Sequence, residues 1–594
     1  MLPLLLGLLA AQTTSDQLAR PILDPKQPQL EAQVYMASRV PPVQLPRSAA
    51  DWDTQRDTLR RRILEEVVFR GEARSWRTSN RKVEFTGEIP GDGYRIRKLR
   101  FEILPGMWAP AVLYEPANPS GKLPVVLNVN GHEKDGIATP YIQQRCVQLA
   151  RMGYLAFNGE WMGRGVLDLP GFNHYSMPQL DLTGSSGLAV FFLEMERSLD
   201  ILLQHPNADP QRVAVTGLSG GGWQTTFLTA LDPRIKLAVP VAGHSSFITR
   251  TQMPMMDMGD SEQTPSDLAT VADYLHLTAM TAPRPLLLIN NAKDNCCFRA
   301  DYAMAPLVQT ANAIFKTYNA ADRFSYYINH SDGHNYDGFS RRELYKFLSR
   351  QFQTAPPPVE TPIAPRSAQE LTSALPADNL TFQSLAQRLA AGLPKPGKAT
   401  KENLARIVRY QKLALDVDAV NAPYYAIRTT SGAWTIPAVS LGPADAKQAV
   451  ILIADEGRRS QAARAEQLIG EGKRVFAVDP FLIGENKIKE RDFLFALLLA
   501  SLGERPLGLQ ASQLAAVARW LTTQGHSVTI EAHGRRTSLA AQVAAALEPQ
   551  IQSAKLNGNL TSLKQAMHEN IQVPDFPELF CFGLLESFDI DQIR

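Results

Sequence analysis

A serine lies among four glycines in the stretch "RVAVTGLSGGGWQTTFLTAL", residues 212–231, between an apolar strand-like run and a helix-like run. Glycine weakens strands and helices alike because it loses the most backbone freedom on folding, so this cluster requires a local reason. The spacing Gly217-x-Ser219-x-Gly221 between a strand and a helix is typical of a sharp turn that exposes a serine Oγ. A glycine-rich turn that binds phosphate, or that only reverses the chain, is the alternative. The rest of the chain has to decide between them.

Length and charge restrict the class of protein. A chain of 594 residues is too long for one ordinary domain, so we expect two or three. The composition, 44% hydrophobic and 20% charged, is typical of a globular protein with ample core material. A formal net charge of +2 gives no electrostatic argument for binding nucleic acid or an anionic membrane.

The N-terminal run "MLPLLLGLLAAQTTS" is long enough for the apolar region of a signal peptide and too short to span a bilayer. We therefore expect residues 1–19 to be a signal peptide or a disordered N-terminus, and the protein to be secreted or periplasmic. A buried or frayed N-terminal segment is the alternative, because no Lys or Arg precedes the run. No later stretch has the pattern of a transmembrane helix.

The chain has four cysteines, which is too few for a disulfide scaffold at this length, and none has the spacing of zinc ligands. The adjacent Cys296 and Cys297 are expected to be small buried side chains. A strained disulfide between them is the alternative in an oxidising compartment.

The rhythm of apolar runs divides the chain into domains. Strand-like runs between about residues 81 and 116 alternate with Gly/Pro/Asp turns and predict an antiparallel meander. From "LPVVLNVNG" onward, short apolar strands alternate with helix-length segments, which indicates a doubly wound, mostly parallel α/β sheet. The proline-rich segment at 354–370 is typical of a stiff linker. We therefore expect a catalytic domain at 20–353 and a second, smaller α/β domain at 371–594.

The second domain repeats the order of segments in the first. The segment "KQAVILIADEGRR" is similar to "KLPVVLNVNGHEK" of the first domain. Two later segments are also similar to segments of the first domain, in the same order and at similar spacing. In this alignment Ser219 is replaced by His533, and Gly221-Gly222 by Arg535-Arg536. The repeat also ends near the point where a counterpart of the first domain's strand-like run "PRPLLLINN" would begin. The second domain is thus expected to be a degenerate copy, structural or binding in role.

Ser219 has two partners further along the chain. A serine hydroxyl needs a base within hydrogen-bond reach, and the base needs a carboxylate to orient it. Asp294 follows the strand-like run "PRPLLLINN", and His334 follows "FSYYINH". This is the chain order Ser, Asp, His of doubly wound hydrolases, whose loops meet at the carboxyl edge of the sheet. We predict Ser219 as nucleophile, Asp294 as acid and His334 as base.

Weaker alternatives for two of these roles lie in the same loop as His334. His330 is the other candidate base, and Asp332 and Asp337 are the other candidate acids. His334 is preferred because it lies deeper in a glycine-flanked loop, just ahead of the next helix. Asp332 and Asp337 are disfavoured because each is a close neighbour of the base on its own loop.

The remaining candidate residues lie in the loops after two earlier strands. A tetrahedral oxyanion requires two preorganised N–H donors, and the first is expected from the backbone of Gly220. The second is expected from His132 or Glu133, after the strand "PVVLNVNG". Glu160 and Trp161 follow the strand "YLAFNG" and are expected near the rim as substrate-binding residues. Ordinary packing is the alternative for Trp161.

Residues from about Tyr94 to Leu348 resemble the α/β-hydrolase superfamily, in the branch of acetyl xylan esterases and dienelactone-hydrolase-like enzymes. The resemblance is carried by "LDILLQHPNADPQRVAVTGLSGGGWQTTFLTALDPRIKLAVPVAG", by "TAPRPLLLINNAKDN" and by the "SDGHNY" loop. It implies the triad Ser219, Asp294 and His334, with no metal and no organic cofactor. Two segments, 161–189 and 245–277, would wall the pocket in such a fold. The second contains the methionine-rich "TQMPMMDMGD", an adaptable apolar surface.

The expected function is that of a secreted serine carboxylesterase that removes acetyl or similar acyl groups from a carbohydrate through an acyl-enzyme. A prolyl-oligopeptidase-like peptidase shares the triad order and is the enzyme alternative. It usually has an N-terminal β-propeller, for which the roughly 90 residues before "LPVVLNVNG" are too few. A carbohydrate-binding protein without catalysis is the alternative from a different class. The expected partner is a small acyl ester or an acetylated carbohydrate.

Overall fold

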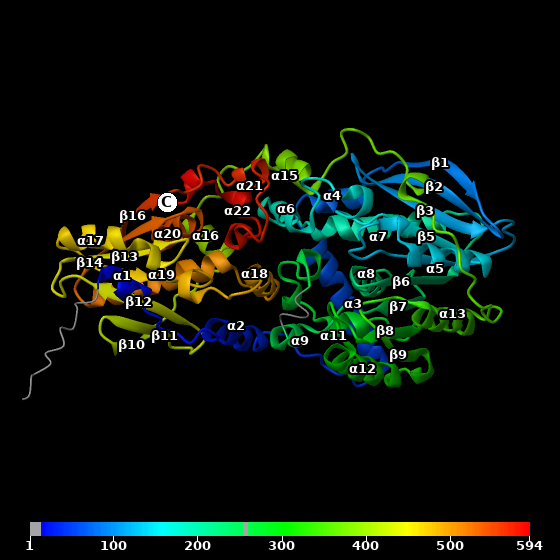
Figure 1. Ribbon diagram of the computed structural model, residues 1–594, viewed down its shortest axis with the longest axis horizontal. Coiled ribbons are helices and arrows are strands. Elements are labelled where there is room, and N and C mark those ends of the chain that lie inside the picture. The colour runs from blue at the N-terminus through cyan, green and yellow to red at the C-terminus, as the bar shows by residue number, and fades with distance from the viewer. Residues whose placement is uncertain (1–12, 254–258) are drawn as a thin grey trace, which may run out of the picture.

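The computed structural model describes residues 13–253 and 259–594 and forms two lobes, each built around one sheet (Figure 1). The first sheet has nine strands in the order β1-β2-β3-β5-β4-β6-β7-β8-β9, and the second has seven in the order β10-β11-β12-β14-β13-β15-β16. The predicted fold class, a mostly parallel α/β sheet with an antiparallel meander and a smaller second α/β domain, is confirmed. Most of the predicted apolar run at 1–15 and the methionines at 255–258 lie outside the described residues.

The first sheet combines the meander with six strands that run parallel to one another. The meander consists of β1 (Val83–Pro90), β2 (Tyr94–Leu104) and β3 (Met107–Pro116), paired antiparallel. The parallel strands are β4 (Leu123–Asn128), β5 (Leu155–Gly159), β6 (Ala208–Leu218), β7 (Leu237–Val241), β8 (Leu286–Lys293) and β9 (Phe324–Asp332).

Helices cover both faces of this sheet, because consecutive strand residues point to opposite sides. Val125 and Leu127 of β4 belong to one apolar cluster, whereas Val126 belongs to the other. The first cluster includes residues of α3 (Ala49–Ile63), α7 (Leu188–Leu203), α8 (Gly220–Leu231) and α12 (Ala300–Thr317). The second includes residues of α5 (Pro140–Arg151) and α13 (Gly338–Phe352). Shorter helices of this lobe are α4 (Ala73–Thr78), α6 (Pro178–Leu182), α9 (Phe247–Gln252) and α11 (Tyr274–Ala279).

The second sheet repeats the strand order of the first up to its seventh strand. Its strands are β10 (Leu415–Asn421), β11 (Tyr424–Thr429), β12 (Thr435–Leu441), β13 (Gln448–Ala454), β14 (Arg474–Val478), β15 (Ser527–His533) and β16 (Ile551–Asn557). An antiparallel meander again leads into β14, β13, β15 and β16, which run parallel. Counterparts of β8 and β9, the strands that precede Asp294 and His334, are not among the described strands of this sheet.

The helices that follow the proline-rich segment are, in chain order, α14 (Ala368–Leu371), α15 (Phe382–Ala390), α16 (Lys401–Ile407), α17 (Ala462–Gly470), α18 (Asp492–Ser501), α19 (Pro506–Thr523), α20 (Arg535–Leu547), α21 (Gln565–His568) and α22 (Leu584–Ser587). The residues of β13, β15, α19 and α20 pack in the same large apolar cluster as the first lobe. The two lobes therefore share one continuous core. No helix among the described residues is long and apolar enough to cross a membrane.

The turn between β15 and α20 corrects the sequence alignment of the repeat by one residue. Ser219 is the single residue between β6 and α8, with φ 58°. Its counterpart between β15 and α20 is Gly534, with φ 110°, so His533 takes the place of Leu218 instead. The alignment of sequence letters failed here because it matched Gly534 to Gly220, whereas none of the four glycines of the first turn is kept at its structural position in the second.

A carboxylate occupies the N-terminus of α20. Asp455, in the loop after β13, accepts hydrogen bonds from Arg536 N at 3.1 Å and from Thr537 N at 2.8 Å. It also accepts a bond of 2.8 Å from Thr537 Oγ1. Backbone N–H groups at a helix N-terminus attract an anion. In the second domain this anion is supplied by the protein itself.

The N-terminal residues from Thr13 onward lie against the second domain, which differs from the expected division at residue 19. Helix α1 (Thr14–Ala19) contacts α17, and its Leu18 is fully buried in an apolar cluster with β13 and β14 residues. Helix α2 (Gln27–Ala37) is joined to the second domain through Glu31, which accepts hydrogen bonds from the backbone and side chain of Thr435. Burial of Leu18 stabilises this arrangement, since the free energy of the protein falls when an apolar side chain leaves water.

The proline-rich segment after residue 353 runs along the first domain. Glu360 accepts two hydrogen bonds of 2.8 Å from Arg341 and one of 2.9 Å from Tyr345, both on α13. Gln144 of α5 donates to Thr361 O and accepts from Ile363 N. The segment thus lies bound along the surface over α5 and α13.

Asp267 joins the two domains. Its carboxylate accepts hydrogen bonds from Arg505, in the second domain, at 2.8 and 3.0 Å, and from Arg70 at 2.6 Å. Burial alone would raise the pKa of Asp267, but the charges of Arg505 and Arg70 outweigh it and lower that pKa to about 2. The second domain therefore braces the 245–277 segment, which was expected to wall the pocket.

We expect Asp267→Asn to reduce the free energy of unfolding by about 3 kcal/mol, because removing one partner of a buried ion pair leaves the other charge uncompensated. Urea denaturation at pH 7 measures the change. The control is Glu66→Gln, which removes an exposed ion pair with Arg62 at 2.9 Å and should cost about 0.5 kcal/mol or less. Equal losses for the two variants would contradict the bracing role.

Candidate active site

Ser219 is placed by a strained turn between β6 and α8. Its φ of 58° lies in the left-handed region, which non-glycine residues rarely adopt and which marks functional turns. Helix α8 passes very close to two neighbouring strand ends. A Cβ on Gly221 would lie 2.4 Å from Val129 O, and one on Gly222 would lie 2.6 Å from Val241 O. These contacts supply the local reason for the glycine cluster, because any side chain there would displace the serine.

Asp294 and His334 are brought together as predicted from the sequence. His334 Nδ1 and Asp294 Oδ2 are 2.7 Å apart, and the Asp294 side chain is fully buried. The other carboxylate oxygen, Oδ1, accepts hydrogen bonds from Cys296 N at 2.9 Å and Cys297 N at 3.1 Å. Burial would raise the pKa of Asp294, but the hydrogen bond and charge of His334 outweigh it, so this pKa is lowered. The carboxylate is therefore charged and fixed in orientation.

The second ring nitrogen of His334 is available for a proton transfer. His334 Nε2 is buried and has no hydrogen-bond partner among the described residues. Burial lowers the pKa of His334, but the hydrogen bond and charge of Asp294 raise it by more, so the net shift is upward. Ser219, Asp294 and His334 follow β6, β8 and β9, which occupy neighbouring positions on one side of β4 in the sheet. The alternatives in this loop have other roles: Asp337 caps α13, and Asp332 pairs with Lys293 at the surface.

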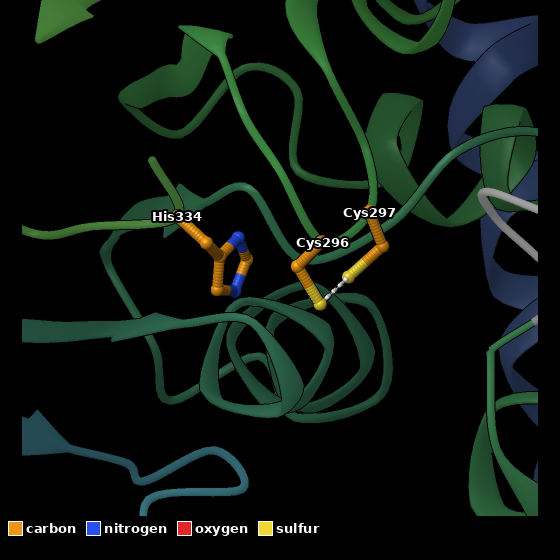
Figure 2. A group of neighbouring side chains, drawn as sticks. All are labelled: Cys296, Cys297 and His334. Carbon is orange, nitrogen blue, oxygen red and sulfur yellow. Dashed lines mark hydrogen bonds between the residues drawn. The ribbon is translucent and has the colours of Figure 1, made fainter. Parts of the chain in front are cut away.

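Cys296 and Cys297 lie beside His334 and are not joined in a disulfide (Figure 2). Their sulfur atoms are 3.2 Å apart. Cys296 is exposed and Cys297 is half-buried, so the expectation of buried side chains is corrected for both. The reason is that their backbone N–H groups bind Asp294, which directs the side chains outward from the turn. The hydrogen bond with Cys297 is the main cause that lowers the pKa of Cys296 to about 6.

The loop after β4 lies against the start of α8, as expected for an oxyanion-binding loop. A Cβ on Gly131 would lie 3.1 Å from Gly220 N and 2.6 Å from Leu218 O. His132 and Glu133 follow directly, and the Glu133 side chain is hydrogen-bonded to Tyr141 on α5. The loop that contains His132 and Glu133 therefore lies beside Gly220.

Trp161 does not lie at the rim. It is 1% exposed, and its ring lies against Gly220, where a Cβ would be 2.3 Å from the indole. Ring contacts with His132 at 4.8 Å, His174 at 4.6 Å and Phe191 at 6.0 Å surround it. The structure therefore corrects the expected place near the rim in favour of the alternative, ordinary packing, because the ring is already surrounded by protein.

Glu160 is also buried, with 1% of its surface exposed. Its carboxylate accepts a hydrogen bond of 3.0 Å from Ile137 N and lies where a Cβ on Gly136 or Gly165 would clash. Burial raises the pKa of Glu160 to about 8, against the opposing hydrogen bonds of Ile137 and Val166. Two loops fold around this neutral carboxyl, so its position is structural and not at the expected rim.

We expect Glu160→Gln to flatten the pH dependence of stability. The folded protein keeps the Glu160 proton up to about pH 8, whereas the unfolded chain releases it near its ordinary, lower pKa. The wild type therefore loses stability as pH rises between those values, by at most about 1.4 kcal/mol per pH unit. Glutamine cannot ionise, so the variant gains on the wild type from pH 5 to pH 8. Urea unfolding across this range measures it. Exposed Glu65→Gln is the control, and an unchanged slope, or a raised KM instead, would contradict the structural role.

Four titratable side chains behind Trp161 form a cluster that sequence reasoning missed. His132, His174, Asp260 and Glu262 bring their polar atoms within 4.8 Å of one another. Burial lowers the pKa of His174, but the neighbouring carboxylates of Glu262 and Asp260 raise it to about 10. The residues come from three segments far apart in the chain, so no local spacing could have indicated the cluster.

The first domain has the α/β-hydrolase fold, as its strand order, its Ser219 turn and the Asp294–His334 pair together define it. Two family models match this domain: the prolyl oligopeptidase family over residues 194–354 and the dienelactone hydrolase family over residues 109–265. The expected resemblance is therefore confirmed, and both matches indicate a hydrolase. The two matched ranges overlap across the Ser219 turn.

Individual relatives are distant. YtaP of Bacillus subtilis (strain 168), which carries the name of a hydrolase, is 22% identical over 257 residues, 41% of this chain and 83% of its own. Among solved structures, Methylesterase BT1017 has a TM-score of 0.47 and 20% identity, covering 62% of this chain and 78% of its own. Acetyl Xylan Esterase 1 from Thermoanaerobacterium has a TM-score of 0.36 and 16% identity over 53% of this chain and 98% of its own. A glucuronoyl esterase from Solibacter usitatus scores 0.42 at 15% identity, over 53% and 99%.

Proposed function

We propose that the chain is a serine-dependent carboxylic ester hydrolase that removes acetyl or similar small acyl groups from a carbohydrate. The observation that carries the proposal is the Asp294–His334 hydrogen bond of 2.7 Å, with His334 Nε2 left without a partner among the described residues. A fixed imidazole with one nitrogen bonded to a carboxylate and the other available is the general base that a serine nucleophile requires. The motifs around Ser219 support the acetyl xylan esterase branch.

In the proposed reaction, Ser219 Oγ attacks the ester carbonyl carbon while His334 Nε2 takes the hydroxyl proton. The carbonyl oxygen becomes an oxyanion, which the N–H groups of Gly220 and His132 or Glu133 stabilise. The tetrahedral intermediate then expels the sugar alkoxide, which receives the proton from His334, and an acyl-Ser219 remains. Water, deprotonated by the same His334, hydrolyses this acyl-enzyme and releases the carboxylic acid.

The test compares the wild-type protein on acetylated xylan and on 4-nitrophenyl acetate, with released acetate and 4-nitrophenol as readouts. Cleavage of both substrates supports the whole proposal. Cleavage of the small ester alone supports the serine hydrolase and rejects the carbohydrate substrate. If the wild-type protein cleaves neither substrate but still binds xylan, the carbohydrate-binding alternative is favoured.

A peptidase is the second candidate, because the prolyl oligopeptidase family model matches residues 194–354. This range contains all three triad residues. The same assay series therefore includes a chromogenic prolyl peptide anilide. A turnover number for the anilide above that for acetylated xylan would favour the peptidase.

The proposal includes export from the cytoplasm and a bracing role for the second domain. Residues 1–12 supply the apolar run expected of a signal peptide and lie outside the described residues. Because Leu18 is buried against the second domain, a cleavage site before Thr13 fits the structure better than one near residue 19. The second domain also holds the 161–189 segment, where Gln179 donates hydrogen bonds of 3.0 Å to Asn570 and to Ile571 O.

A further inference from the structure

Two histidines and two carboxylates converge from three separate segments of the first domain. His132 lies in the loop after β4, and His174 begins the single turn His174–Ser176 that precedes α6. Asp260 and Glu262 lie at the turn Ser261–Gln263 in the 245–277 segment. His174 is 2% exposed, Glu262 0% and Asp260 8%, so three of the four are removed from water. Burying such groups together is costly unless something compensates their charges and lone pairs.

Four of the six distances between the polar atoms are close to those of a metal coordination shell, and the other two, from Glu262 to His132 and to Asp260, are at most 4.8 Å. His132 Nε2 lies 3.3 Å from His174 Nδ1 and 3.0 Å from Asp260 Oδ2. His174 Nδ1 lies 3.4 Å from Asp260 Oδ2 and 3.0 Å from Glu262 Oε2. Tetrahedral ligands at zinc bond lengths of about 2.0–2.2 Å are separated from one another by about 3.3–3.6 Å. The four measured separations are close to this value.

The surroundings of the cluster fix the ligand atoms as a metal site requires. His174 Nε2 is 2.7 Å from Met162 O, so this nitrogen carries the proton that it donates and Nδ1 faces the cluster. Binding of the second ring nitrogen to a backbone carbonyl is the usual support of a metal-binding histidine. Asp260 Oδ1 accepts a hydrogen bond of 2.8 Å from Ser261 N, which leaves Oδ2 directed at the two histidines.

A proton alone satisfies the cluster poorly. A proton on His132 Nε2 can be donated to Asp260 Oδ2 at 3.0 Å, but the single proton on His174 Nδ1 cannot be directed at both Asp260 and Glu262, which lie 3.4 and 3.0 Å from it. Glu262 Oε2 is fully buried and has no hydrogen bond of acceptable geometry among the described residues, although it lies 3.0 Å from His174 Nδ1. One doubly charged cation, bound with the Glu262 carboxylate drawn towards His132, would contact all four atoms.

We propose that His132 Nε2, His174 Nδ1, Asp260 Oδ2 and Glu262 Oε2 bind one divalent transition-metal ion, with zinc as the best fit. Imidazole nitrogen combined with carboxylate oxygen suits zinc, whereas calcium and magnesium prefer ligand sets made of oxygen alone. All four corners are supplied by protein, which is the pattern of a structural zinc site and not of a catalytic one. This proposal replaces the expectation of no metal, which considered only cysteine spacing and the family resemblance.

The ion would cross-link the loop beside Gly220 with both segments expected to wall the pocket. Its role is therefore to hold the backbone of His132 in position, without touching the reacting atoms. The test of this proposal does not depend on the proposed ester hydrolysis, because it measures the metal content of the protein and not its activity.

The experiment measures zinc in the full chain, purified without a polyhistidine tag and without chelators, by elemental mass spectrometry. We expect about one zinc per chain, removed by prolonged dialysis against a chelator and regained on adding zinc chloride. Regained zinc should raise the thermal midpoint, since a ligand that binds only the folded state stabilises it. Cobalt chloride added to the apo-protein should give the intense visible absorption of tetrahedral cobalt.

Glu262→Gln should lose the zinc and the cobalt spectrum. The matched control is Glu115→Gln, which removes a buried carboxylate 2.8 Å from a single histidine, His205, and should retain the metal. Should Glu262→Gln fail to fold, the cobalt spectrum of the wild type decides. The proposal is overturned if the wild type regains less than about a tenth of an equivalent of zinc and cobalt keeps the spectrum of its hydrated ion. It is equally overturned if Glu262→Gln folds and binds as much zinc as the wild type.

Discussion

Ser219→Ala is expected to lower kcat for 4-nitrophenyl acetate on the order of 10⁶-fold, with little change in KM. Alanine removes the hydroxyl oxygen that we propose forms the acyl-enzyme, while the turn, α8 and the neighbouring loops should keep their positions. The residual rate would come from the oxyanion-binding N–H groups and from substrate binding alone. Initial rates at saturating ester, followed by the release of 4-nitrophenol, measure the effect.

The matched control for this variant lies in the second domain. His533→Ala changes the residue next to the equivalent turn, and it should leave the rate unchanged within about twofold, as expected for a substitution away from the reacting groups. Far-ultraviolet circular dichroism of both variants verifies that they are folded. Ser219→Ala that retains its activity, or folded His533→Ala that loses it, would contradict the assignment of Ser219 as the nucleophile.

Asp294→Asn is expected to lower kcat on the order of 10⁴-fold, because the asparagine amide favours the wrong tautomer of His334. The substitution preserves the size of the side chain, and an amide oxygen can still accept the hydrogen bonds of Cys296 N and Cys297 N. The fold of the loop should therefore survive. KM should change little, since Asp294 is buried behind the base and does not contact substrate.

The pH profile separates this positioning role from general damage. His334 acts as a base only when neutral, so kcat/KM of the wild type should rise with pH through the pKa of His334. The Asp294 carboxylate is what raises that pKa against the effect of burial. Without the carboxylate, the acid limb of the profile should move to lower pH. An acid limb that stays in place, or moves upward, would show that Asp294 does not act on His334. Asp332→Asn, which changes an exposed carboxylate of the same loop, is the control.

The sequence predicted best what depends on local pattern. The meander followed by a mostly parallel sheet, the turn at Ser219 and the pairing of Asp294 with His334 followed from apolar runs, glycines and the rule that parallel strands end at one edge. Contacts between segments distant in the chain were not predictable in this way. Trp161 was expected at the rim, but His132, His174 and Phe191 surround its ring. Nothing in the residues next to Trp161 indicates those contacts.

Two further differences have equally specific physical causes. The side chains of Cys296 and Cys297 are not buried, because the N–H groups of both residues are bound to Asp294, a contact that residue type alone does not reveal. The alignment of the repeat was displaced by one residue because backbone conformation, a positive φ at Gly534, is retained there without the flanking glycines. Similarity of letters is a weak guide where only the backbone geometry is kept.

Asp455 marks a difference in charge between the equivalent helix N-termini of the two domains. The first turn of α8 is proposed to direct its N–H groups at charge that develops on a substrate, whereas the first turn of α20 has its N–H groups neutralised permanently by Asp455. An anion that must come and go supports turnover, and one that is built into the chain supports stability. We therefore propose that the chain contains the same kind of helix N-terminus twice, once to bind a transient oxyanion beside Ser219 and once bound permanently by Asp455. A reagent that mimics a tetrahedral oxyanion should accordingly find a single site per chain.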